Sequence, residues 1–109
     1  MEGLIEGRIV HYVLNDNDAG SVNQKRAASF GYSPDAPKGA QMHLGNRAMA
    51  GEHCPAIVVR VWPHEYGDDK PGANLQVFLD GNDSLWVTSA KFAEPEAIEL
   101  GTWHWVEKA

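Results

Sequence analysis

The strongest indication of secondary structure in this 109-residue chain is the stretch Pro55-Ala56-Ile57-Val58-Val59-Arg60-Val61-Trp62. β-branched residues dominate it, and a second proline follows it directly, so it is typical of a short β-strand that cannot extend at either end. Side chains alternate between the two faces of a strand, which predicts that Arg60 shares a face with Val58 and Trp62.

Four further stretches have strand character. They are residues 7–14, residues 74–80, residues 84–90 after the turn-forming sequence Asp80-Gly81-Asn82-Asp83, and residues 101–106. Five short strands with one tight hairpin predict a mainly β fold, a small SH3-like five-stranded barrel that forms a single domain over residues 1–109. We expect its core to contain Ile57, Val59, Val61, Val77 and Trp103, with Trp105 on the same inward face.

A long interval, residues 15–53, separates the first two strands. Asn15-Asp16-Asn17-Asp18 and residues 33–37 are typical turns, while residues 41–49 are compatible with a short helix between two glycines. We therefore predict a long loop, in part helical, after the first strand. A loop of this length in a compact domain usually carries function.

The charge and cysteine content exclude several classes of protein. A net charge of -6 and a pI near 5.2 repel phosphate backbones, so we expect no nucleic acid polymer as a partner. The single cysteine, Cys54, provides no disulfide framework, which favours a reducing compartment. The first residues carry acidic side chains and no long apolar run, so we expect a cytoplasmic protein that does not bind a membrane.

No motif predicts catalysis, a metal or a cofactor. The five histidines show no HxxxH or HxH spacing, and phosphate-binding loops and a GxSxG motif are absent from the sequence. Cys54 follows His53, but adjacent strand residues point to opposite faces and do not form a catalytic dyad by themselves. The protein is therefore predicted not to be an enzyme.

Aromatic and cationic side chains provide the candidate binding site. Indole rings stack on planar ligands, and a guanidinium beside an indole, as at Arg60 and Trp62, suits a phosphate or carboxylate next to a ring. The alternative is that the aromatic residues fill the barrel interior. The candidate ligand-binding residues are Tyr12, Arg26, Asn46, Arg47, Arg60, Trp62, Trp86 and His104.

The predicted strands resemble a group of small proteins encoded by bacteriophages and prophages. The runs that carry the likeness are residues 7–13 (GRIVHYV), 55–62 (PAIVVRVW), 74–78 (NLQVF) and 101–105 (GTWHW). The resemblance does not extend to the long loop and assigns no catalytic or binding residue. It implies a non-enzymatic protein of the host cytoplasm that sequesters a small anionic or nucleotide-like immune signal or inhibits a host defence.

The same resemblance leaves an alternative open. A protein-binding module or virion component would need only an exposed apolar patch or a free strand edge, with a host or virion protein as its partner. Four tryptophans in so small a domain also lead us to expect a homo-oligomer.

Overall fold

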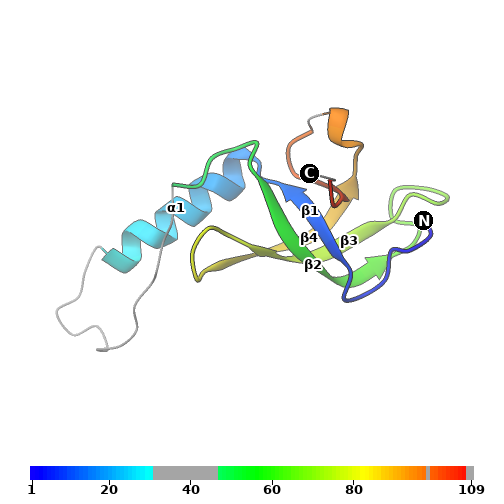
Figure 1. Cartoon of the computed structure of the whole chain (residues 1–109), viewed down its shortest axis with the longest axis horizontal. Helices are drawn as coiled ribbons and strands as arrows, with labels where there is room; N and C mark the ends of the chain where they lie inside the picture. The colour runs from blue at the N-terminus through cyan, green and yellow to red at the C-terminus, as the bar shows by residue number, and fades with distance from the viewer. Residues whose placement is uncertain (31–46, 98, 108–109) are drawn as a thin grey trace.

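The computed structural model describes residues 1–30, 47–97 and 99–107 as a closed five-stranded barrel with one helix (Figure 1). The elements follow in the order β1 (Ile9–Val13), α1 (Asp16–Phe30), β2 (His53–Trp62), β3 (Gly72–Phe78), β4 (Ser84–Phe92), the 3-10 helix η1 (Pro95–Ala97) and β5 (Thr102–Trp105). Neighbouring strands are antiparallel except for β4 and β5, which form a short parallel pair. The predicted mainly β, SH3-like barrel is confirmed.

β2 begins at His53, two residues earlier than predicted, and contains Pro55. The Val58 N–H donates to the Arg8 carbonyl at 2.9 Å, and the Val58 carbonyl accepts from the Gly7 N–H, so both bonds run to the segment directly before β1. Backbone nitrogens of successive strand residues point to alternate neighbours, so the nitrogen of Pro55 points away from β1 and toward β3. The pairing of β2 with β3 begins only at Ala56. Proline is tolerated here because no ladder hydrogen bond is required of it.

The predicted core is correct in part. Val77 and Trp103 are fully buried as expected, whereas Ile57 and Val61 are half-buried and Val59 is exposed. The prediction for β2 had the wrong phase: before residue 59 the buried side chains are Cys54, Ala56 and Val58, not the odd-numbered residues.

A β-bulge between Val58 and Arg60 breaks that alternation. Val59 is the additional residue, so Val58 faces the interior while Arg60 and Trp62 both face outward. The predicted common face of Arg60 and Val58 is therefore wrong, although Arg60 and Trp62 do share a face. A bulge of this kind re-aims side chains, and such irregularities are common near functional sites.

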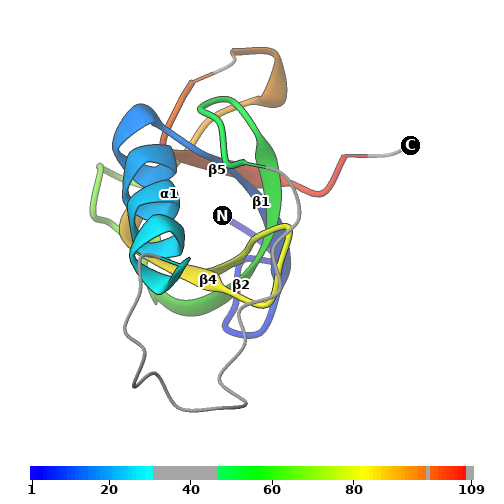
Figure 2. The same ribbon diagram turned by 90° about the vertical axis from the view of Figure 1, so that its left-hand side faces the viewer.

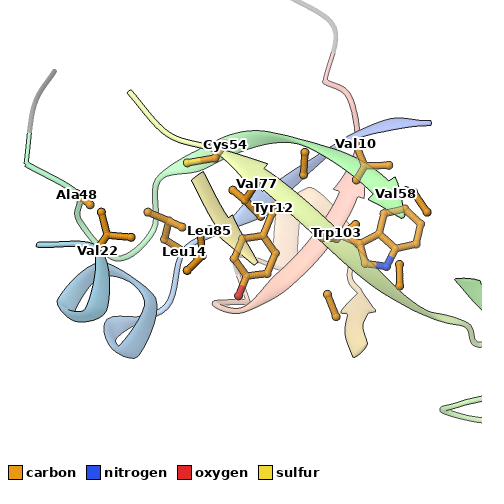
Figure 3. Packing of buried hydrophobic residues seen from close by; sticks show 14 of the residues in the cluster. Val10, Tyr12, Leu14, Val22, Ala48, Cys54, Val58, Val77, Leu85 and Trp103 are labelled. Carbon is orange, nitrogen blue, oxygen red and sulfur yellow. The ribbon is translucent and has the colours of Figure 1, made fainter. Parts of the chain in front are cut away.

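The core extends along the barrel and continues under α1 (Figure 3). Trp103 fills one end, Tyr12 lies in the middle, and Leu14 carries the cluster toward Val22 of the helix. Trp105 is half-buried and packs edge-on against Trp103 with ring centroids 5.2 Å apart. The prediction of an inward Trp103 is thus confirmed.

Helix α1 replaces the turn predicted at residues 15–18, and Figure 2 shows it lying in front of the barrel. Asn15 and Asp18 cap it reciprocally: the Asp18 N–H donates to Asn15 Oδ1 at 2.7 Å, and the Asn15 N–H donates to Asp18 Oδ2 at 3.1 Å. Such a capping box satisfies amide donors that the first helical turn leaves unpaired.

The composition of the buried side of α1 explains why the sequence pattern did not predict this helix. Ala19, Val22 and Arg26 are buried at helical spacing, but one of the three is charged, so the apolar period is weak. The turn predicted at residues 33–37 and most of the helix predicted at residues 41–49 fall outside the described residues. Residues 47–49, which are described, are not helical.

Among the described residues, no helix combines the length and apolar character that crossing a membrane requires.

Candidate functional site

The outward side of the barrel sheet exposes several large apolar side chains. Register pairs join Ile9 to Ile57, Ile57 to Gln76, and Gln76 to Trp86, which makes one row across β1, β2, β3 and β4. Trp86 is 50% exposed and Trp62 is 38% exposed. We define the outer face by this row and its exposed neighbours on the same side: Ile9, Ile57, Val59, Arg60, Trp62, Gln76, Phe78 and Trp86.

Arg60 and Trp62 form the polar end of the outer face. The guanidinium carbon of Arg60 lies 4.6 Å from the Trp62 ring centroid, within the range of a cation–π contact. Trp62 Nε1 donates to Asn74 Oδ1 at 3.1 Å, which fixes the orientation of the indole. The predicted pairing of this guanidinium with this indole is confirmed.

Asn74 also holds an irregular stretch of β4. Its Oδ1 accepts a hydrogen bond from the Ser89 N–H at 2.9 Å, and Ser89 adopts a φ of 53°, which L-residues seldom occupy. The Tyr66 hydroxyl donates to the Ser89 carbonyl from the other side. These contacts offset the backbone strain and are typical of a site whose shape is functionally constrained.

An open groove adjoins this strained segment. It has a volume of about 540 Å³ and is lined by Trp62, Pro63, His64, Glu65 and Ser89. The groove combines an aromatic wall with one basic and one acidic side chain. It is therefore suited to a side chain of a partner or to a small polar ligand.

Tyr12 and Arg26, two of the three predicted ligand residues that are buried, make their polar contacts inside the fold. Tyr12 is buried, and its hydroxyl donates to Asp18 Oδ2 at 2.5 Å; burial and this bond raise its pKa well above the ordinary value. Arg26 is only 6% exposed, and its guanidinium donates to both Asp83 oxygens, at 2.7 and 2.9 Å. The guanidinium of this predicted ligand-binding residue is therefore engaged inside the fold.

The remaining predicted residues are distributed over the molecule. Asn46 lies outside the described residues, Arg47 is exposed, and His104 is buried at the end of β5. The structure therefore brings together Arg60 and Trp62 from the predicted set, with Trp86 on the same outer face.

A second cluster gathers groups that could hold a metal ion. His11, His104 and Glu107 each offer one ligand atom, and these atoms lie within 4.8 Å of one another. His53 joins them, with its Nδ1 2.6 Å from Glu107 Oε1. Hydrogen bonds from His53 and His104 lower the pKa of Glu107 to about 2.

Cys54 faces away from this cluster, as the alternation in β2 predicts. Its side chain is buried in the core while His53 is exposed. Burial, together with the charge of Glu52, raises the pKa of the Cys54 thiol to about 11. The thiol is therefore protonated near neutral pH and is a poor nucleophile there.

Comparisons with protein-family models, curated proteins and solved structures find no match. The assignment of a candidate site therefore rests on the geometry of this structure alone.

Sequence reasoning missed Asn74, Ser89 and Tyr66. Asn74 stands inside an apolar alternation and Ser89 follows a threonine in a strand, so each looks like a solvated strand residue. Only the two bulges on either side of β3 bring them together. An asparagine in a strand interior, where that residue type is rare, is the one signal that marks this position.

Proposed function

We propose that this protein is a non-enzymatic binding module of phage origin that attaches through its outer face to a host or virion protein. The observation that carries the proposal is the exposure of Trp62 and Trp86 on the outside of the barrel, with Arg60 stacked on Trp62. Tryptophan and arginine are the residues most enriched at energetic centres of protein interfaces. Exposed apolar groups on a folded monomer commonly mark such surfaces.

A small anionic or nucleotide-like ligand is the second candidate. The groove beside Trp62 and the neighbouring guanidinium of Arg60 favour it, because a ring and a cation together suit a base with its phosphate. Arg26, however, uses its guanidinium on Asp83 inside the fold. Because Arg26 is not available to a phosphate, the hypothesis of a protein partner is better supported than that of an anionic ligand.

Affinity capture tests the two candidates. Tagged parent protein, the double variant Trp62→Ala/Trp86→Ala and the control Leu100→Ala are incubated with host lysate and with disrupted virions, and retained proteins are identified by mass spectrometry. Leu100 is an exposed apolar residue that lies outside the outer face. We expect one protein to be retained by the parent and the control but not by the double variant.

Titration of the purified partner against each variant then measures how much each tryptophan contributes to the binding affinity. Each tryptophan at an interface centre is worth about 2 kcal/mol or more, so each single variant should weaken binding at least about 30-fold. If no partner behaves in this way, while calorimetry shows nucleotide binding that Arg60→Gln weakens, the small-ligand candidate replaces the proposal. Native mass spectrometry that shows a dimer lost on Trp86→Ala would instead assign the outer face to self-association.

A further inference from the structure

Three histidines from three adjacent strands converge on one carboxylate. His11 of β1 is the register partner of His104 of β5, and His53 of β2 approaches from the other side of β1. The rings of His53 and His104 lie 4.8 Å apart, and those of His11 and His104 lie 5.7 Å apart. Glu107, which follows β5, reaches back over all three rings.

One oxygen stands at the centre of the cluster. Glu107 Oε1 lies 2.6 Å from His53 Nδ1, 2.6 Å from His104 Nε2 and 3.7 Å from His11 Nδ1. The first two are hydrogen bonds, but the third distance is too long for one. His11 Nδ1 is shielded from solvent and has no hydrogen-bond partner.

We propose that His11, His53, His104 and Glu107 form a binding site for a divalent transition-metal ion of the zinc class. Imidazole nitrogens and a carboxylate oxygen are the ligands that Zn²⁺ accepts in proteins, and four of them complete its tetrahedral shell. A buried nitrogen without a partner is uncommon in a folded protein, and metal coordination would satisfy it. A hydrogen-bonded surface cluster alone leaves His11 Nδ1 unexplained.

For His11, His104 and Glu107 the required rearrangement is small. Zinc takes nitrogen and oxygen ligands at about 2.0–2.2 Å, so the ligand atoms of a tetrahedral site stand about 3.4 Å apart. The observed limit for His11, His104 and Glu107 is 4.8 Å. His104 is 1% exposed and fixed, whereas the side chains of His11 and Glu107 are 25% and 43% exposed and have room to rotate toward it.

The site would fasten the end of the described chain to the barrel. Glu107 is hydrogen-bonded to side chains of β2 and β5 and lies 3.7 Å from His11 of β1, so a bound ion would link three strands and the segment that follows β5. Because the carboxylate completes the ligand set, the arrangement resembles a closed structural site more than a catalytic one with an open position. A ligand that binds the folded state raises the melting temperature.

Zinc titration of the full chain, freed of metal by a chelator, tests the proposal. Binding is measured by competition with a chromophoric chelator for the parent, His11→Ala, His53→Ala, Glu107→Gln and the control His64→Ala. His64 is an exposed histidine that lies outside the cluster. His104→Ala is not used, because that side chain is buried and its loss could prevent folding.

We expect the parent and His64→Ala to bind one Zn²⁺ per chain and to melt at a higher temperature with zinc. His53→Ala should weaken binding about 100-fold or more, since changes even to groups that support metal ligands cost 10–100-fold. Co²⁺ should give the intense visible absorption of a tetrahedral site in the parent but not in His53→Ala. A parent that binds no zinc at equimolar concentration refutes the proposal, as does equal affinity in the parent, His11→Ala and His53→Ala.

Discussion

Replacing Arg26 with methionine is the sharpest test of how α1 is attached to the barrel. Arg26 is buried and makes two charged hydrogen bonds to Asp83, with a further one at 3.3 Å to the Asp80 carbonyl. Loss of one partner of a buried ion pair costs about 3–5 kcal/mol, chiefly because the other charge stays behind. The Asp83 side chain is 15% exposed, so water relieves part of this cost. We expect the free energy of unfolding to fall by about 3 kcal/mol, the lower end of that range.

Urea denaturation followed by tryptophan fluorescence measures this difference, with Arg47→Met as the control. Arg47 is exposed, so the identical chemical change there should alter the free energy of unfolding by less than about 0.5 kcal/mol. If Arg26→Met destabilises no more than Arg47→Met, Arg26 is solvated, and its interpretation as a ligand-binding cation is restored.

The same pair predicts a dependence on pH. The hydrogen bond from Arg26 holds the pKa of Asp83 below its usual range. A carboxyl whose pKa is lowered by folding stabilises the protein above its unfolded pKa of about 3.9, and that contribution is lost as the pH falls through the folded value. The difference between parent and Arg26→Met should therefore be complete above about pH 5 and shrink in more acidic solution. A difference that grows on acidification would contradict the assigned pairing.

Two further predictions concern the core. Trp103→Ala should cost about 3–5 kcal/mol in urea denaturation. Trp103→Phe should cost clearly less, because a phenyl ring refills much of the space and the buried indole Nε1 has no hydrogen-bond partner to lose; a cost as large as that of Trp103→Ala would contradict this account. Cys54 is buried, so the thiol of the folded protein should react slowly with an alkylating reagent and Cys54→Ala should retain partner binding; loss of binding in a folded Cys54→Ala protein would indicate a role for the thiol.

The barrel was predictable because its strands are marked by composition and by turns. The turn at residues 80–83 joins β3 and β4 as predicted, and the apolar run at residues 55–62 lies within β2. The change of phase within β2 was not predictable, since a bulge depends on pairing with β3 and leaves no mark in the strand itself. One inserted residue at Val59 was enough to exchange the inward and outward side chains beyond it.

The helix escaped prediction for a different reason. Asn15 and Asp18 favour turns and helix caps equally, so local propensity alone does not decide between them. Here the Tyr12 hydroxyl also bonds to Asp18, which ties the cap to the core. That contact spans β1 and α1 and becomes visible only when both are placed.

The histidine cluster shows the same limit for a site. Spacing rules detect metal ligands that lie on one element, whereas His11, His53 and His104 come from three strands of the barrel. Closure of the barrel brings β1 and β5 side by side, and the observed register then sets His11 opposite His104. The register that achieves this, however, was not fixed by the sequence pattern.

The distribution of positive charge bears on the choice between a protein partner and an anionic ligand. Among the described residues, Arg26 is neutralised by Asp83, while Arg8, Arg60 and Lys91 each lie over a different aromatic ring. A phosphate is typically held by several charged donors that converge on it. A cation stacked on an aromatic ring instead presents one charge beside a large apolar surface. Such combinations are typical of the residues that contribute most of the binding energy at protein interfaces. In a chain of net charge -6, the use of these four cations favours recognition of a protein surface over capture of a phosphate.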